Sequence, residues 1–154
     1  MEDIINGINH WIQTVPKVYN SMSETEISNR PLPNKWSKKE ILGHLCDSAI
    51  NNINRFIKIQ YEEQPFVIQS YNQNQWVILQ NYQERPLHEI LNLFLALNKQ
   101  IINTISNIPK ERLSNLCDIG NNQQKTLEWL VKDYLKHMEH HINNQILIKH
   151  NALY

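Results

Sequence analysis

The stretch WSKKEILGHLCDSA, at positions 36–49, begins the most clearly marked helix in this sequence. Ser37 and Glu40 form a capping box, in which the serine hydroxyl accepts from the free N–H three residues on and the glutamate reaches back to the N–H of the cap. Apolar side chains then recur along one side from Ile41 to Ile59. We therefore expect a helix over residues 37–61.

Three further segments carry apolar residues at helical spacing. They predict helices over residues 3–22, 86–107 and 126–150. Pro86 suits the first turn of its helix, and Thr126 is a suitable N-cap for the last one. Pro16 lies inside the first of these helices, where we expect it to kink or split the helix.

Glycine is scarce, with three residues in 154, and no alternating apolar pattern of convincing length occurs. Both facts favour helices over sheet. We therefore expect an all-α fold, a four-helix bundle forming one domain over residues 1–154. Residues 62–85 are the least readable, although Gln73 is placed to begin a short helical turn. Gly120 marks a turn within the connection at 110–125.

The composition argues against some classes of binding partner for this chain and suits others. Fifteen basic side chains balance fifteen acidic ones, so the chain has no electrostatic footprint for nucleic acid or an anionic membrane surface. There is no apolar run long enough for a membrane span and no cleavable signal pattern. Cys46 and Cys117 are isolated from each other, which is typical of reduced thiols. We expect a cytoplasmic protein that binds a small-molecule substrate, with no nucleic-acid or membrane partner.

Seven histidines occur, and two of them, His137 and His141, stand one helical turn apart. Both rings can point at the same spot from one side of a helix. A third imidazole from another helix, with His44 as the candidate, would complete a three-nitrogen cup. Such a cup suits Zn²⁺ or a similar divalent metal and leaves a coordination position open for water or substrate.

Helical phase selects among the histidines of the last helix. His141 falls within the apolar stripe of that helix, and His137 lies at its edge, about 40° away. His140 is turned about 100° from His141 toward the polar side. We therefore expect His137 and His141 to point inward and His140 to be a bystander at the rim.

His44 lies beside the apolar stripe of its helix and shares an edge with Ser48, Asn51 and Arg55. This polar strip has two interpretations of equal weight. It lines a solvent-accessible site between two helices, or it is the start of the solvated face. Cys46, two residues from His44, faces nearly the opposite way and is a poor co-ligand.

The segment LPNKWSKKEILGHLCDS at 32–48 resembles the pattern P-x-K-W-S-x-x-E-(I/V)-(L/I)-x-H-L-x-D-S of the DinB-like superfamily. The segment HMEHHINNQI at 137–146 is similar to the last helix of that family. The similarity extends over nearly the whole chain in order and spacing and is weakest in the middle.

This resemblance implies a four-helix bundle of up-down-down-up type, a homodimer, and a divalent metal held by His44, His137 and His141. Relatives in the family include metal-dependent transferases that use low-molecular-weight thiols such as bacillithiol, and mycothiol-dependent maleylpyruvate isomerase, and some members are labelled metal-dependent hydrolases. We therefore expect a metal-dependent enzyme, thiol-S-transferase-like or hydrolase-like. Its cofactor would be Zn²⁺ or Ni²⁺, with a low-molecular-weight thiol as cosubstrate in the transferase case. The alternative is a non-catalytic binding or dimerisation bundle with a vestigial or empty metal site.

Overall fold

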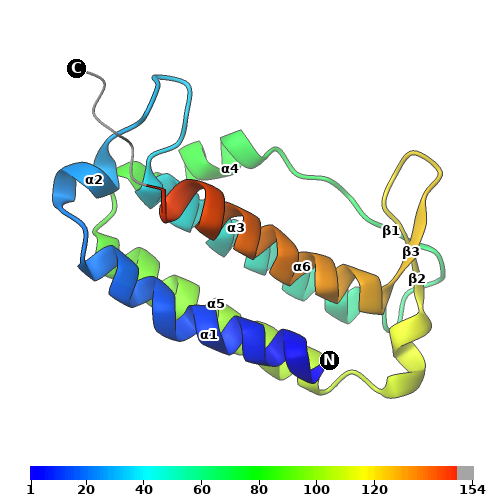
Figure 1. The fold of residues 1–154 in the computed structure, drawn as a ribbon. Helices are drawn as coiled ribbons and strands as arrows, with labels where there is room; N and C mark the ends of the chain where they lie inside the picture. Colours follow the sequence, from blue (N-terminus) through cyan, green and yellow to red (C-terminus); the bar gives the residue numbers. More distant parts are fainter. Residues whose placement is uncertain (149–154) are drawn as a thin grey trace.

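Four long helices dominate the computed structural model, which describes residues 1–148 (Figure 1). They are α1 (Glu2–Asn20), α3 (Lys38–Lys58), α5 (Leu87–Ser106) and α6 (Leu127–His141). The predicted four-helix bundle is thereby confirmed. The predicted last helix continues beyond α6 as a π-helical turn, Ile142–Ile146, and its expected end at residue 150 lies outside the described residues.

The helices follow an up-down-down-up order. In Figure 1, α1 and α6 run in one direction while α3 and α5 run in the other. Helices α3 and α5 are therefore parallel, so the chain must return along the full length of the bundle between them. Helix α3 packs against both α5 and α6, and α1 packs against the same two helices from the other side. This order makes α3 and α6, which carry the histidines, direct neighbours.

The first helix forms because its apolar residues recur every three or four positions, and Ile4, Ile8, Val15 and Tyr19 are all buried along one side. Pro16 does not split it, since α1 continues past the proline to its end. A second, unpredicted short helix, α2 (Glu24–Ser28), follows, and its N-cap Ser23 accepts from a backbone N–H in its first turn.

The capping box at the start of α3 is present as predicted. The Ser37 hydroxyl accepts from the Glu40 N–H, and a Glu40 carboxylate oxygen accepts from the Ser37 N–H, each at 3.1 Å. Arg30 also donates to both oxygens of that carboxylate, at 2.7 and 3.2 Å, which ties the preceding loop to the helix. The helix ends three residues before its predicted end, at Lys58.

Two connecting segments meet in a small sheet that the sequence did not predict. Its strands are β1 (Phe66–Val67), β2 (Leu116–Asp118) and β3 (Gln124–Thr126). β2 lies in the middle, parallel to β1 and antiparallel to β3. Strands of two or three residues are too short to produce an alternating pattern, which explains why the sequence favoured helices alone.

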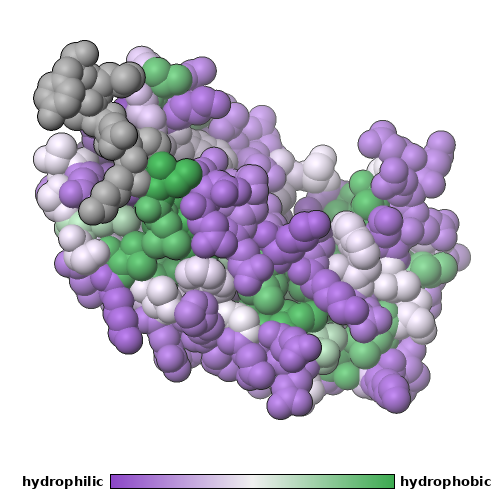
Figure 2. All heavy atoms as spheres, in the orientation of Figure 1, coloured by the Kyte–Doolittle hydropathy of each residue, from purple (hydrophilic) through white to green (hydrophobic). Residues whose placement is uncertain are grey.

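Two expected features of the connecting segments are confirmed. Helix α4 (Gln73–Leu79) begins at the residue predicted for a short helical turn, and Asn72 caps it. Thr126 caps α6 by accepting from the Trp129 N–H at 3.1 Å. On the face drawn in Figure 2, apolar side chains reach the surface in separate patches between polar ones. No helix within residues 1–148 is both long and apolar enough to cross a membrane.

Candidate metal centre

The three predicted histidines meet between α3 and α6. His44 Nε2 lies 3.3 Å from His137 Nε2, and His141 Nε2 lies 3.1 Å from the same atom. One ring nitrogen from each residue can be chosen so that all three lie within 4.8 Å of one another. His44 is fully buried, whereas His137 and His141 are half-buried, so the cluster is reached from the α6 side.

This donor set fits a divalent metal ion. Imidazole nitrogens bind Zn²⁺ at about 2.0–2.1 Å, which in a tetrahedral site separates the ligands by about 3.3–3.4 Å. The separations of His137 Nε2 from the other two Nε2 atoms, 3.1 and 3.3 Å, are close to that value. Three nitrogen donors also suit Ni²⁺ and Cu²⁺, and three ligands leave a tetrahedral position open.

The cluster is uncharged at neutral pH. Burial, followed by the neighbouring His141 and His137, lowers the pKa of His44 to about 3. Burial and the other imidazoles lower the pKa of His137 to about 4, and burial lowers that of His141 as well. Neutral imidazoles keep a lone pair available, which is the form that binds metal.

Gln145 orients His141. Its Oε1 lies 2.6 Å from His141 Nδ1. Since an amide oxygen only accepts, Nδ1 carries the proton and the lone pair remains on Nε2, the atom that faces the other two histidines. Helical spacing did not assign this role to Gln145, although it stands four residues after His141, in the stretch that resembles the family.

Trp36 covers His44. The indole and imidazole ring centres are 4.8 Å apart with 34° between the ring planes. Trp36 directly precedes the cap of α3, so the capping box that starts the helix also places the indole next to the histidine about two turns on. His44 Nδ1 is buried and has no hydrogen-bond partner within the described chain.

The remaining candidate side chains lie outside the cluster. His140 is exposed, and its Nδ1 accepts from the Asn144 amide at 2.9 Å, which agrees with its predicted rim position. Cys46 is buried, its pKa is strongly raised by burial, and its thiol faces the Ile90 carbonyl. Asp47 accepts from the Tyr82 hydroxyl at 2.7 Å, and Glu139 accepts from the Trp11 indole at 3.4 Å.

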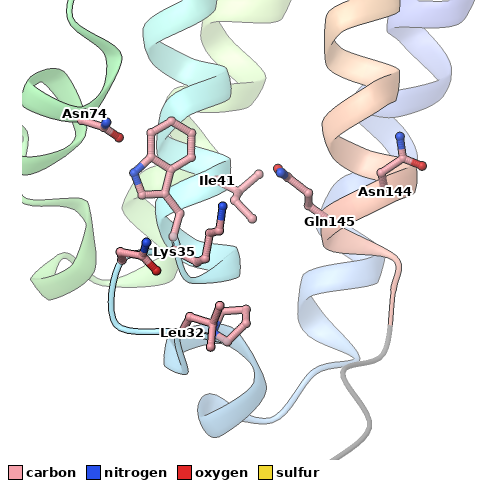
Figure 3. Close-up of a pocket in the computed structure, with 9 residues that line it drawn as sticks. Leu32, Lys35, Ile41, Asn74, Asn144 and Gln145 are labelled. Atoms are coloured by element: carbon pink, nitrogen blue, oxygen red, sulfur yellow. The ribbon is translucent and has the colours of Figure 1, made fainter.

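The cluster lies between two cavities. The larger, of about 560 Å³, is lined by Trp36, which covers His44, and by Gln145, which lies against His141. In Figure 3, Gln145 points across this cavity toward Ile41. The smaller, of about 170 Å³, is lined by His137 itself.

The polar strip on α3 lines the smaller cavity, because Ser48 and Arg55 both form part of its wall. His44, at the start of the strip, and Ser48 are buried. Of the two interpretations of this strip, the structure therefore supports a site between two helices over a solvated face.

The fold is a four-helix bundle of up-down-down-up order, and three histidines converge in it from α3 and α6. It therefore belongs to the class of bundles that can hold a metal in their core. The sequence profile of the DinB superfamily matches residues 10–144, which include all three histidines. The chain belongs to the DinB superfamily.

Two curated relatives are similar over most of the chain. "Putative metal-dependent hydrolase BH0277" of Halalkalibacterium halodurans is 24% identical over 79% of this chain and 70% of its own length. "Putative metal-dependent hydrolase OB0413" of Oceanobacillus iheyensis is 20% identical over 96% of this chain and 89% of its own length. These names belong to the relatives, and both describe metal-dependent proteins.

Two solved structures share the fold. YfiT from Bacillus subtilis, described as a probable metal-dependent hydrolase with an unusual four-helix bundle topology, superposes with a TM-score of 0.80 at 19% identity. The match covers 92% of this chain and 81% of that one. A mycothiol-dependent maleylpyruvate isomerase superposes with a TM-score of 0.73 at 11% identity, over 96% of this chain and 62% of that one.

Proposed function

We propose that the protein is a metal-dependent enzyme acting on a small molecule, with His44, His137 and His141 as the ligands of one divalent ion. The observation that carries the proposal is the approach of three Nε2 atoms to within 3.1 and 3.3 Å of their neighbours, between two cavities. Zn²⁺ or Ni²⁺ is the proposed ion because imidazole nitrogen suits both.

The residues around the centre perform distinct tasks in this proposal. Gln145 holds the proton of His141 on Nδ1, so that Nε2 is free to bind. Trp36 closes the side of His44 and limits its access to water. A divalent ion at this centre would supply a Lewis acid that lowers the pKa of a water or a thiol toward neutrality.

Two reaction classes use this chemistry. Hydrolase-like activity is supported by the names of the curated relatives, and activated water would be its nucleophile. Thiol-S-transferase-like activity is supported by the shared fold with a mycothiol-dependent isomerase, and a low-molecular-weight thiol would be its cosubstrate. The rival proposal from another class is a non-catalytic bundle whose histidine cluster stays empty.

Metal analysis of protein purified without a histidine tag distinguishes the metal-dependent enzyme from the non-catalytic bundle. We expect about one divalent ion per chain in the parent protein. His44→Ala, His137→Ala and His141→Ala should each weaken metal binding sharply, because each removes one of three donors. His140→Ala is the matched control and should retain the ion, since His140 pairs with Asn144 instead.

The outcomes are distinct. If all four variants bind metal like the parent, the histidine centre does not exist and the non-catalytic bundle is the better proposal. If His140→Ala loses the ion while His137→Ala keeps it, the ligand set is wrong. A metal-loaded protein can then be assayed for ester or amide hydrolysis and for thiol transfer to an electrophile.

A further inference from the structure

The smaller cavity, which His137 helps to line, also has one cationic and one anionic side chain in its wall, and these two do not form an ion pair with each other. Arg55 comes from α3 and Asp133 from α6, on the two helices that also carry the histidines. Tyr71, from the segment just before α4, contributes to the lining, as does His137. The cavity therefore adjoins the proposed metal centre and has an opposite charge on each helix.

Arg55 is held in place by uncharged groups. Its guanidinium donates to the Gln69 carbonyl at 2.9 Å and lies over the Tyr71 ring, 5.8 Å from its centre. It is half-buried, yet it forms no ion pair with a carboxylate in the described part of the chain. Because a partly desolvated guanidinium normally has an anionic partner, its remaining N–H donors suit a carboxylate.

Asp133 is the anionic side chain that α6 contributes to the same cavity. It stands one helical turn before His137 and is also half-buried. Within residues 1–148 it has neither an ion pair nor a side-chain hydrogen bond, although its neighbour Lys132 pairs with Glu128. A free carboxylate at this position suits a ligand ammonium group and disfavours a ligand that carries only negative charge.

The cavity is small, at about 170 Å³, and has room for a molecule of about the size of an amino acid. We propose that this cavity binds a small zwitterion, with its carboxylate on Arg55, its ammonium on Asp133 and a third group directed to the metal centre at His137. The third contact rests on the proposed function, whereas the first two do not.

Three thiols with the same two-carbon spacing test this proposal. L-cysteine carries both charges, 3-mercaptopropionate lacks the ammonium, and cysteamine lacks the carboxylate. Calorimetric titration of the Zn²⁺-loaded protein should show L-cysteine binding at least about tenfold more tightly than either analogue. Metal content is measured after each titration, so that extraction of the ion by the thiol is recognised.

Two substitutions test which charged group of the ligand binds to Arg55 and which binds to Asp133. Arg55→Met should weaken L-cysteine and 3-mercaptopropionate about tenfold and leave cysteamine unchanged. Asp133→Asn, which keeps the side-chain shape, should weaken L-cysteine and cysteamine and spare 3-mercaptopropionate. Arg112→Met and Asp3→Asn remove the same charges from exposed positions and are the matched controls. Thermal unfolding of each variant verifies that it is folded.

The proposal is overturned if the three thiols bind equally, or if each substitution weakens all three alike. The titrations are repeated with metal-free protein, in which the same order of preference is expected at lower affinity. A protein that holds no metal but keeps this order contradicts the proposed function and supports the zwitterion site. A protein that holds metal but shows no charge preference supports the metal centre of the proposed function and contradicts the zwitterion site.

Discussion

Oε1 of Gln145 lies 2.6 Å from Nδ1 of His141, and the same glutamine lines the larger cavity. The side chain that sets the protonation of one imidazole is therefore exposed to whatever occupies that cavity. This arrangement depends on the π-helical turn Ile142–Ile146, which continues the path of α6 past the last histidine. The glutamine thus connects the cavity to the proposed metal centre.

We expect Gln145→Ala to lower the affinity for Zn²⁺ by about 10- to 100-fold, because the proton on His141 Nδ1 loses its acceptor. Competition titration with a chromogenic chelator measures the change. Asn144→Ala is the matched control, since Asn144 bonds the rim residue His140, and it should leave the affinity within about twofold. Equal effects of the two substitutions would contradict the role assigned to Gln145.

The stability of the metal-free protein should decrease with acid. The folded-state pKa of His44 is about 3 and that of His137 about 4, whereas an unfolded histidine titrates near 6.5. Between about pH 6.5 and 4 the unfolded chain therefore binds more protons, and each extra proton lowers the free energy of unfolding by about 1.4 kcal/mol per pH unit. Above about pH 6.5 both states are neutral and this contribution is flat.

Urea denaturation in the presence of a chelator, at pH 7.5 and 5.0, measures this loss. His44→Gln removes one of the titrating groups, so its stability should change less between the two pH values than that of the parent. His88→Gln, at an exposed position, is the comparison variant. Identical pH dependence in His44→Gln and the parent would show that the buried imidazole does not control the acid response.

Gly43→Ala should destabilise the protein although alanine is the better helix former. A Cβ at residue 43 would lie 2.2 Å from Cδ2 of Tyr82, and Tyr82 is fully buried and bonded to Asp47. The ring cannot retreat, so we expect a net loss of about 1–3 kcal/mol in the free energy of unfolding. This clash outweighs the gain of about 1 kcal/mol in helix propensity.

Gly7→Ala is the matched control for that substitution. It also lies inside a helix, but its Cβ would meet the flexible end of Leu135, 2.6 Å away at Cδ2, and Leu135 is only half-buried. Its loss in unfolding free energy should be smaller than that of Gly43→Ala. Equal losses would mean that the packing of Tyr82 against Gly43 is not tight.

We propose that the protein forms a homodimer, as its resemblance to the family implies. Tyr82, although it lies in the connecting segment next to α4, is fully buried within the chain and cannot lie in the interface. On α4, Ile78 and Leu79 are exposed by 61% and 79% instead. Light scattering at micromolar concentration should give a dimer mass, and Leu79→Asp should shift it toward the monomer; a monomeric parent would refute the proposal.

The sequence by itself determined the features that depend only on residues one or two helical turns apart. The Ser37–Glu40 capping box, the Thr126 cap and the start of α4 at Gln73 each depend on backbone groups a few residues away. The same holds for the pairing of His137 with His141, since residues four apart on a helix share a side. Local spacing also predicted that His140 points elsewhere.

The tertiary structure decided which groups meet across the bundle, whereas spacing named His44 only as a candidate and the resemblance to the family implied its place beside His137 and His141. His44 and His137 are 93 residues apart, and their approach to 3.3 Å depends on α3 packing beside α6. The cover of Trp36 over His44 and the shared cavity of Arg55 and Asp133 have the same origin. Helical periodicity states which side of a helix faces inward, but the rotation and offset of two packed helices are set by the side chains of the whole core.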